Sequence, residues 1–317
     1  MCTCINLKNK YFGRTLDLDR HAKEEAVITP RNYEFITPVT KGFKTKYAII
    51  GTAMVISNLP LYYEGSNELG LAMAGLNFPI NCKYNEEIEG KLNLAVFELI
   101  PYILGRYGSI KELRKDLVNL NITNVSFHEK LPSSPLHYML VDKEESIIIE
   151  QTDTGLHIYQ NEVGIMTNNP SFDIQLENLK KYTKLTPNYL APVDPKFTCV
   201  GLGSIGLPGD YSSMSRFVKA NFLVKNAEVK NNEEDIATFF HLLDGVSMIP
   251  GTVINKQNRN DLTFYSSCYN LEEGTYYYKT YNNNQISVLK LEESNMSSST
   301  LTRFELITTQ QFNYLNK

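Results

Sequence analysis

Residues 1–18, MCTCINLKNKYFGRTLDL, decide how this chain begins to fold. Apolar and polar positions alternate on both sides of Lys8-Asn9-Lys10, and this period of two predicts two antiparallel strands joined by a tight turn. The pattern puts a cysteine at the start of the first strand and an arginine on the strand beside it. The hairpin therefore brings a thiol and a cation onto neighbouring strands.

The position of Cys2, directly after Met1, indicates a particular kind of nucleophile. Removal of the initiator methionine would give one residue both a thiol and a free α-amine. An α-amine has a pKa of about 7.7–8.0, whereas that of a lysine is about 10.4, so the amine can accept a proton at neutral pH. The competing interpretation is a small buried cysteine in a strand, which is a common place for free cysteines.

The composition indicates a globular chain and argues against several classes of partner. Of the 317 residues, 42% are hydrophobic and 21% are charged, which is ordinary for a globular protein. The net charge of −4 gives no electrostatic reason to expect nucleic acid or an anionic membrane as a partner. We expect no secretory signal and no membrane span, since no apolar run approaches roughly 20 residues. Five scattered cysteines then predict reduced thiols and a cytoplasmic location.

Strand patterns open and close the chain, whereas helical patterns fill its middle. Strands are predicted at 26–29, 47–57, 71–78, 136–142, 146–151, 155–160 and 163–167, and again at 261–270, 274–281 and 284–291. Helices are predicted at 92–107, with a kink or interruption at Pro101, and at 110–120, 174–182, 213–229 and 233–246. Residues 183–200 predict a long loop. No composition shift marks a linker, so we expect residues 1–317 to form one α+β domain with helices packed on antiparallel sheets.

The segment Phe12-Gly13-Arg14-Thr15-Leu16-Asp17 carries charged side chains onto the strand beside Cys2. An arginine next to a thiol favours the thiolate. An aspartate near the α-amine would orient it and stabilise its protonated form. The competing interpretation is an Arg14–Asp17 ion pair on the surface, which is common and contributes little to stability.

Other polar residues stand at the ends of predicted elements, namely Asn77, Asn168 and Arg216. Asparagine N–H groups are suitable donors to a developing oxyanion, although an asparagine at a strand end is more often a turn former. His137 and His157 lie inside strand patterns and are interpreted as structural residues. The sequence contains no phosphate loop, dinucleotide fingerprint or zinc-site spacing, so we expect no cofactor and no metal.

A series of motifs along the whole chain resembles one known family. In order, these are MCT, FGRTLDLD, ITPRNYEF, NELGLAMAGLNFP, LPSSPLHYMLVD with SIIIEQT, GIMTNNPSFD, SIGLPGD, SMSRF and YYYKTYNNNQI. The series resembles the choloylglycine hydrolases, specifically the bacterial bile salt hydrolases, within the N-terminal nucleophile hydrolases. The resemblance implies a four-layer αββα sandwich and hydrolysis of the amide that joins a bile acid to glycine or taurine.

The resemblance also implies which residues act. The family's catalytic residues fall on Cys2, Arg14, Asp17, Asn77, Asn168 and Arg216, each with the expected residue type. Matching family positions suggest an apolar groove for the steroid at Leu16, Ile56, Tyr63, Phe127 and Leu131. Cys4 departs from the small residue that is more usual in the family, and we expect it to be tolerated. The implied substrates are conjugated bile salts, and the implied assembly is a homotetramer with residues 183–200 as the main contact.

Two alternatives stay open on the sequence alone. Penicillin V acylase shares the fold and the nucleophile, but the position of Asn77 is typically a tyrosine there, which favours the bile-salt side. A non-catalytic bile-acid or lipid binder would keep the groove without needing the complete set around Cys2. Within the hydrolase interpretation, Gly201-Leu202-Gly203 matches a loop that accompanies a preference for glycine conjugates in some relatives, and it carries no cation for a taurine sulfonate.

Overall fold

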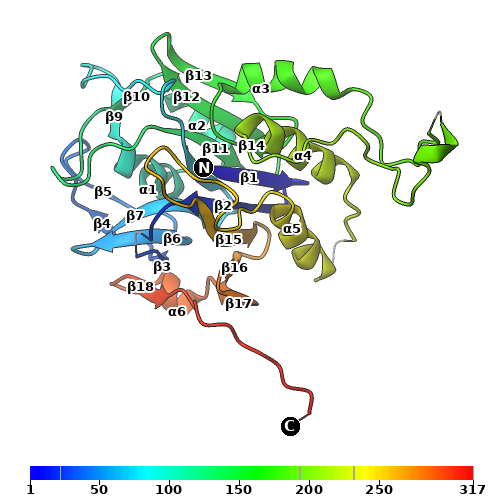
Figure 1. Cartoon of the computed structure of the whole chain (residues 1–317). Helices are drawn as coiled ribbons and strands as arrows, with labels where there is room; N and C mark the ends of the chain where they lie inside the picture. Colours follow the sequence, from blue (N-terminus) through cyan, green and yellow to red (C-terminus); the bar gives the residue numbers. More distant parts are fainter. Residues whose placement is uncertain (22, 193, 231–232, 317) are drawn as a thin grey trace.

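Two stacked β-sheets with helices on their outer faces make up the computed structural model of this chain (Figure 1). The structure describes residues 1–21, 23–192, 194–230 and 233–316. One sheet has six strands in the order β14-β1-β2-β15-β16-β17, and the other has eight in the order β13-β12-β11-β8-β7-β6-β3-β18. Neighbouring strands run antiparallel in both sheets, as the sequence predicts.

The N-terminal hairpin lies inside the six-stranded sheet, paired on both sides. The strands of this sheet are β14 (Ile165–Met166), β1 (Cys2–Leu7), β2 (Tyr11–Leu18), β15 (Leu262–Asn270), β16 (Thr275–Thr280) and β17 (Asn283–Lys290). The eight-stranded sheet comprises β13 (Gly155–Gln160), β12 (Ser146–Thr152), β11 (Leu136–Val141), β8 (Ala72–Asn77), β7 (Leu59–Asn67), β6 (Ile49–Ile56), β3 (Glu25–Thr29) and β18 (Thr302–Glu305). Two short pairs lie outside the large sheets: β4 (Glu34–Phe35) with β5 (Phe43–Lys44), and β9 (Leu92–Ala95) with β10 (Leu120–Thr123).

Side chains alternate along the eight-stranded sheet and divide the apolar interior into two clusters. In β8, Ala72 and Ala74 belong to a cluster with residues of the six-stranded sheet, whereas Met73 belongs to a second cluster with helices α1 (Val96–Arg106) and α2 (Ile110–Leu117). Helices α3 (Phe172–Leu179), α4 (Ser213–Asn226) and α5 (Glu234–Asp244) pack on the six-stranded sheet side. The order of layers is αββα, so the expected fold class is confirmed.

Three shorter helical segments complete the described structure: η1 (Lys180–Tyr182), η2 (Pro195–Phe197) and α6 (Glu293–Met296). Across the described ranges, every helix is too short or too polar to cross a bilayer.

The helix predicted at 92–107 is partly wrong. Residues Leu92–Ala95 form β9, which pairs in parallel with Leu120–Thr123, so Leu120 also lies outside the helix predicted at 110–120. Helix α1 begins at Val96 and runs through Pro101 without ending there. The missing N–H of Pro101 removes one backbone hydrogen bond, while burial of Leu99 and its apolar neighbours stabilises the helix by about 1.5–3 kcal/mol per large side chain.

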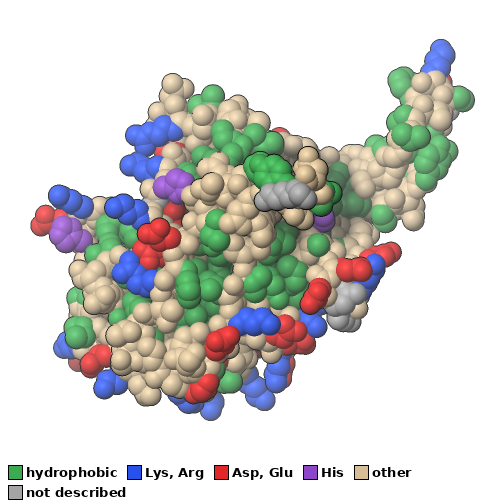
Figure 2. Space-filling model, turned by 90° about the horizontal axis from the view of Figure 1, so that it is seen from below, with side chains coloured by type: hydrophobic (Ala, Val, Ile, Leu, Met, Phe, Trp, Pro, Cys, Tyr) green, Lys and Arg blue, Asp and Glu red, His purple; other side chains and the backbone are tan. Residues whose placement is uncertain are grey.

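The long loop predicted at 183–200 forms a projecting arm, which we define as residues 183–205 apart from Val193, a position outside the described residues. The arm extends away from the body of the molecule, and apolar side chains are visible along it in Figure 2. Large hydrophobic residues on it are exposed: Tyr189, Leu190, Phe197, Val200 and Ile205. Exposed apolar residues gathered on one segment are typical of a contact surface.

Gly13 allows β2 to approach β15 closely. A Cβ atom at this position would lie 1.9 Å from the backbone oxygen of Ser267, and backbone atoms cannot rotate away as a side chain can. We therefore expect Gly13→Ala to lower the free energy of unfolding by roughly 1–3 kcal/mol, measured by urea denaturation. Gly209→Ala is the matched control, because a Cβ there meets no atom within 4 Å, and its unfolding free energy should stay within about 0.5 kcal/mol of the wild type. Equal effects of the two substitutions would contradict the close approach.

Candidate active site

The pairing of β1 with β2 places Cys2 beside a buried arginine. Cys2 is the first residue of β1, and its cross-strand partner is Leu16. The Nη2 atom of Arg14 donates a hydrogen bond to Cys2 Sγ at 2.6 Å. Cys2 is 2% exposed and Arg14 is 1% exposed, so this contact is shielded from water. A guanidinium in contact with sulfur stabilises the thiolate form, which is the nucleophilic form of cysteine.

Arg14 also joins the two sheets. Its Nη1 atom donates to the backbone oxygens of Gly75, at 2.7 Å, and Tyr63, at 3.4 Å, both in the eight-stranded sheet. The same atom lies 3.8 Å from the buried carboxylate of Glu64, which accepts a hydrogen bond from the Tyr265 hydroxyl. Burial opposes the charge of Arg14, but the Cys2, Tyr265 and Glu64 groups outweigh it and raise the pKa of the guanidinium. Arg14 is therefore a permanent cation between the sheets.

Asn168 links the start of β1 to the end of β8. Its Oδ1 atom accepts hydrogen bonds from the Cys2 backbone nitrogen and from Arg216 Nη2, both at 2.8 Å. Its Nδ2 atom donates to the backbone oxygen of Asn77 at 2.7 Å. Arg216 Nη1 reaches the Cys2 backbone oxygen and the Thr3 hydroxyl, each at 2.6 Å. One asparagine and one arginine thus hold both backbone polar atoms of Cys2.

The loop before helix α4 determines where Arg216 points. Ser212 caps the helix by accepting from Ser215 N at 3.3 Å. Asp210 accepts from Ser212 N at 2.9 Å and from the Ser215 hydroxyl at 2.6 Å. Hydrogen bonds with the side chains of Ser212 and Ser215, and then with the Ser212 backbone, lower the pKa of Asp210 to about 2. Arg216 Nε donates back to Tyr211 O at 3.0 Å. Burial lowers the pKa of Arg216, against the raising effects of nearby Asp17 and Cys2.

Asp17 is buried two residues beyond Thr15 on β2. Its carboxylate accepts hydrogen bonds from Thr15 Oγ1 at 3.0 Å and from Thr263 Oγ1 at 2.6 Å. Its backbone pairs with Met1: Met1 N donates to Asp17 O at 2.6 Å, and Asp17 N donates to Met1 O at 3.0 Å. Thr15 Oγ1 in turn accepts from Thr3 N at 3.1 Å. Asp17 therefore reaches the neighbourhood of Cys2 through Thr15 and Thr3.

All six sequence-predicted catalytic residues lie in one connected cluster. Hydrogen bonds link Cys2 directly to Arg14, Asn168 and Arg216. Asn77 joins the cluster through its backbone oxygen, while the residue itself is exposed.

The five predicted groove residues come from β2, β6, β7 and the connection between β10 and β11. Leu16 is 2% exposed and belongs to the cluster of apolar residues that includes the inter-sheet core. Ile56 ends β6, and the half-buried Tyr63 lies on β7. Phe127 packs edge-on against Phe97, with ring centroids 5.2 Å apart, and Leu131 pairs with His128 in the same connection. A groove formed by all five therefore stays a prediction.

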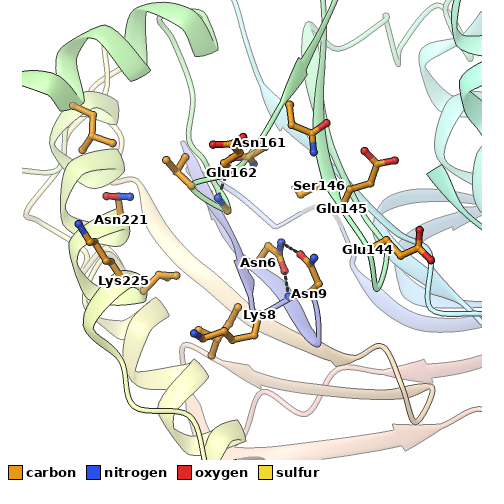
Figure 3. A pocket seen from close by; sticks show the side chains of 16 residues that line it. Asn6, Lys8, Asn9, Glu144, Glu145, Ser146, Asn161, Glu162, Asn221 and Lys225 are labelled. Carbon is orange, nitrogen blue, oxygen red and sulfur yellow. Dashed lines mark hydrogen bonds between the residues drawn. The ribbon is translucent and has the colours of Figure 1, made fainter. Parts of the chain in front are cut away.

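A cavity of about 820 Å³ lies at the opposite end of β1 from Cys2 (Figure 3). Asn6, Lys8 and Asn9 line it from the first hairpin, and Asn221 and Lys225 line it from helix α4. Polar side chains dominate the labelled part of the wall, and the six predicted catalytic residues are absent from its lining. A steroid needs an apolar surface, so this cavity does not support the predicted substrate site.

Cys4 lies on the same strand face as the proposed nucleophile but is chemically different. Its cross-strand partner is Arg14, and it is fully buried. Burial raises the pKa of the Cys4 thiol, so the group stays protonated at neutral pH. Of the two cysteines in β1, only Cys2 accepts a hydrogen bond from the Arg14 guanidinium.

Several residues around the cluster were not identified from the sequence. A signal existed for Glu64, because a carboxylate within the apolar strand pattern of 59–67 requires a buried partner. Thr263 bonds Asp17, and Gln175 Nε2 donates to the backbone oxygen of Asn168 at 3.2 Å. Neither a threonine in a strand nor a glutamine in a helix is unusual, so the sequence carried no signal for them. In the described part of the chain, no group of three or more His, Cys, Asp or Glu side chains could hold a metal ion.

Comparison with known proteins assigns the chain to a family. A family model described as linear amide C–N hydrolases, choloylglycine hydrolase family, matches residues 2–304. The chain belongs to the choloylglycine hydrolase family. The resemblance inferred from the motifs is therefore confirmed, as is the expectation of an amidohydrolase acting on linear amides.

Relatives and solved structures of this family extend over the full chain. A bile salt hydrolase/transferase of Lactiplantibacillus plantarum is 40% identical and one of Clostridium perfringens is 35% identical, with 100% of both chains covered in each case. A crystal structure of a mutant conjugated bile acid hydrolase from Clostridium perfringens superposes with a TM-score of 0.92 at 33% identity, again covering 100% of both chains. A penicillin V acylase from Agrobacterium tumefaciens has a TM-score of 0.76 at 19% identity, covering 96% of this chain and 91% of its own, which shows a shared fold.

Replacing Arg14 with glutamine should slow alkylation of Cys2 by iodoacetamide at pH 7. We expect the rate of alkylation to fall by about tenfold or more, because the opposite charge that stabilises the thiolate is removed. Arg14→Lys keeps the positive charge but lacks the planar guanidinium, so its rate of Cys2 alkylation should lie between those of the wild type and Arg14→Gln. The N-terminal peptide carries both Cys2 and Cys4, so tandem mass spectrometry is used to locate the label on Cys2. The exposed Cys199 in the same sample is the internal control, with no change expected. Equal Cys2 rates in wild type and Arg14→Gln would contradict the role of this contact.

Proposed function

We propose that this protein hydrolyses the amide bond of glycine- or taurine-conjugated bile salts, with Cys2 as an N-terminal nucleophile. The observation that carries the proposal is the hydrogen bond from the Arg14 guanidinium to the Cys2 thiol, inside a cluster that also holds the Cys2 backbone. The substrate class is supported by two relatives aligned over their full length, both called bile salt hydrolase/transferase. Conjugated bile salts are therefore the proposed small-molecule partners, without a cofactor.

The proposed reaction begins once Met1 has been removed. Cys2 then carries an α-amine, which takes the thiol proton and leaves a thiolate beside Arg14. The sulfur attacks the amide carbonyl carbon, and the electron pair of the C=O bond moves onto oxygen. Asn168 Nδ2 carries two hydrogens, of which Asn77 O accepts one, so the other is the proposed donor to this oxyanion. The side chain of Asn77 is the proposed second donor.

Collapse of the tetrahedral intermediate completes the first half of the reaction. The C–N bond breaks, the α-ammonium of Cys2 gives its proton to the leaving nitrogen of glycine or taurine, and the bile acid stays on Cys2 as a thioester. The amine then takes a proton from water, whose oxygen attacks the thioester carbonyl carbon. The C–S bond breaks, the α-ammonium returns its proton to the Cys2 sulfur, and the free bile acid leaves. Arg216 would hold the Cys2 backbone oxygen throughout, and Asp17 would tune the amine by way of Thr15.

The two alternatives are weaker on specific grounds. A penicillin V acylase of Pectobacterium atrosepticum is 28% identical over 58% of this chain, whereas the bile salt hydrolase/transferases of Lactiplantibacillus plantarum and Clostridium perfringens align over all of it. A non-catalytic binder has no need of a buried arginine in contact with a thiol, since burying a charge costs several kcal/mol unless it is paired. Bile salt hydrolysis is therefore the favoured proposal.

Substituting the proposed nucleophile should abolish turnover of conjugated bile salts. Cys2→Ala keeps the strand but removes the thiol, so glycine or taurine release should fall to below about one part in 10⁴ of the wild-type rate. Cys4→Ala is the matched control, because it removes a thiol two residues away on the same strand face, and its rate should remain that of the wild type. Amino-acid release from glycocholate and taurocholate is measured beside phenoxyacetate release from penicillin V.

Three outcomes of this assay would count against the proposal. Turnover by Cys2→Ala would exclude Cys2 as the nucleophile. Faster cleavage of penicillin V than of either bile salt would favour the acylase, and no cleavage of any substrate would favour the binder. Mass spectrometry of the active protein should show a chain beginning at Cys2, and a preparation that retains Met1 should be inactive.

We expect the same assay to show a preference for glycine conjugates. The loop Gly201-Leu202-Gly203 lacks a cation that could bind the taurine sulfonate, and a tenfold difference in kcat/KM corresponds to roughly 1.4 kcal/mol. Packing also favours glycine at position 203, because a Cβ atom on Gly203 would lie 2.2 Å from Pro187 O. We therefore expect glycocholate to exceed taurocholate by about tenfold in kcat/KM. An equal or reversed ratio would contradict the preference and leave the hydrolase proposal standing.

We further propose a homotetramer in the cytoplasm, with the arm as its main contact. The exposed apolar residues of the arm support the assembly, and five free cysteines suit a reducing compartment. Sedimentation at micromolar concentration should give a tetramer, and Phe197→Ser combined with Val200→Ser should weaken it. Val118→Ser is the matched control, because Val118 is 72% exposed at the end of helix α2, outside the arm. A stable wild-type monomer would exclude the tetramer.

A further inference from the structure

A buried histidine–glutamate pair lies between the two strand ends that carry Asn77 and Asn168. His137 on β11 is 2% exposed and Glu150 on β12 is 0% exposed. His137 Nδ1 lies 2.9 Å from Glu150 Oε1, and His137 Nε2 lies 2.7 Å from the backbone oxygen of Thr167. The first of these contacts connects neighbouring strands, and the second reaches the segment that follows β14 in the other sheet. The pair therefore bridges the two sheets beside the site.

The partners of His137 determine where its protons are. A backbone oxygen can only accept, so Nε2 carries a hydrogen and donates it to Thr167 O. The 2.9 Å contact between Nδ1 and Glu150 Oε1 then needs one further proton, held on either atom. Both ring nitrogens are thus occupied by protein groups, and the imidazole has no nitrogen left for a substrate. This arrangement suits a structural role rather than that of an acid–base catalyst. We call the His137–Glu150 pair, together with its hydrogen bonds to Thr167 O and Phe172 N, the bracket.

The pair also contacts the backbone on both sides of the site. The ring of His137 stacks on Phe78, the residue after Asn77, with centroids 4.3 Å apart and planes 3° from parallel. Glu150 accepts from Phe172 N at 3.1 Å and 3.3 Å through its two oxygens. Helix α3 begins there, and its N-cap residue makes no side-chain hydrogen bond, so Glu150 takes the place of a cap. Two side chains thereby contact the residue that follows Asn77 and residues on both sides of Asn168.

The connection to the nucleophile runs through one peptide unit. Thr167 O, which His137 holds, belongs to the peptide bond that leads directly into Asn168. Asn168 Oδ1 accepts from Cys2 N at 2.8 Å, and Asn168 Nδ2 donates to Asn77 O at 2.7 Å. A shift of the Thr167 peptide would therefore move the asparagine amide relative to Cys2. Misplacement of a catalytic group by about 1 Å can cost about 100-fold in rate.

We propose that His137 and Glu150 are positioning residues that hold the Asn168 amide in place against Cys2. The inference deepens the proposed hydrolase function, since it assigns how the oxyanion donor of that reaction is oriented. The pair acts through Thr167 and Phe78 and touches neither the nucleophile nor the substrate in the proposed reaction. What matters is that every hydrogen bond in the bracket is made, and the ionic character of the pair is secondary.

Substitutions that keep the bracket and substitutions that break it should differ in kcat. Glu150→Gln keeps it, because the amide oxygen can accept from Phe172 N while the amide nitrogen donates to Nδ1 of a neutral His137, so kcat should stay within about threefold of the wild type. The double substitution His137→Phe with Glu150→Leu removes both polar partners without burying an unpaired charge. It should lower kcat for glycocholate by about 10- to 100-fold with KM within about twofold.

The matched control is His157→Phe. His157 lies on β13 opposite Glu150, but its ring bonds Thr154 and stacks on Tyr159. Within the described residues it makes no hydrogen bond or ring contact with Thr167 or Asn168. Its kcat should stay within about twofold of the wild type. Circular dichroism and urea unfolding show whether each variant is folded. Should the double substitution fail to fold, His137→Gln replaces it, because its single amide group cannot span both Thr167 O and Glu150.

A double-mutant cycle with Asn168→Ala distinguishes positioning from general damage. Asn168→Ala alone should lower kcat by about 10²–10³-fold, which is measurable at high enzyme concentration. If the bracket acts through Asn168, breaking it in the Asn168→Ala background should change kcat by less than about threefold. If the bracket instead acts on the fold in general, the fold-losses in kcat from the bracket substitutions and from Asn168→Ala should multiply.

Several results would overturn the inference. These are full kcat in the variant with the broken bracket, a loss of equal size in the Asn168→Ala background, or a Glu150→Gln variant as inactive as the double substitution. The last result would mean that the carboxylate itself takes part in proton transfer. Failure of the proposed function is distinguishable, because it would show as absent glycocholate turnover by wild type or retained turnover by Cys2→Ala before any bracket variant is compared.

Discussion

A buried cation between two β-sheets is the constraint on which this structure depends. An arginine removed from water is costly unless partners surround it, and no single sheet supplies enough of them. Arg14 takes the Cys2 thiol from its own sheet and the Gly75 backbone oxygen from the other, with the Glu64 carboxylate nearby. The stacking of the two sheets therefore satisfies the charge and at the same time places it against the proposed nucleophile. The fold and the proposed reactivity of Cys2 depend on the same contact.

Asn168 is the second point at which distant parts of the chain converge. It is bonded by the start of β1, by the end of β8 and by helix α4 through Arg216. A side-chain amide suits this place because it offers one acceptor and one donor group at fixed geometry. The backbone that carries it is in turn held by His137, so the site is supported on several sides by buried hydrogen bonds. Such networks are rigid when every member is satisfied.

Local patterns were sufficient for most of the secondary structure. Period-two alternation predicted the first hairpin, and strand patterns predicted β11 and β12. Both pairs are present, and all four strands are buried along nearly their whole length. The prediction was wrong at Leu92–Ala95, where apolar residues at helical spacing form a strand instead. Their partners, Leu120–Thr123, lie more than twenty positions away along the chain, and no local pattern reveals a parallel partner at that distance. Tertiary pairing decided the state of this segment.

The sequence by itself determined which residue types stand at the ends of the strands. From the motifs it identified Cys2, Arg14 and Asn168, along with the other members of the cluster, and the family to which the chain belongs. Only the tertiary structure decided what these residues contact. The sequence indicated His137 as a structural residue but not its partners. Glu150 comes within reach through the pairing of β11 with β12, and Thr167 only when the two sheets stack. Hydrogen bonds act over about 3 Å, and it is the packing of the whole chain that brings such distant groups within that range.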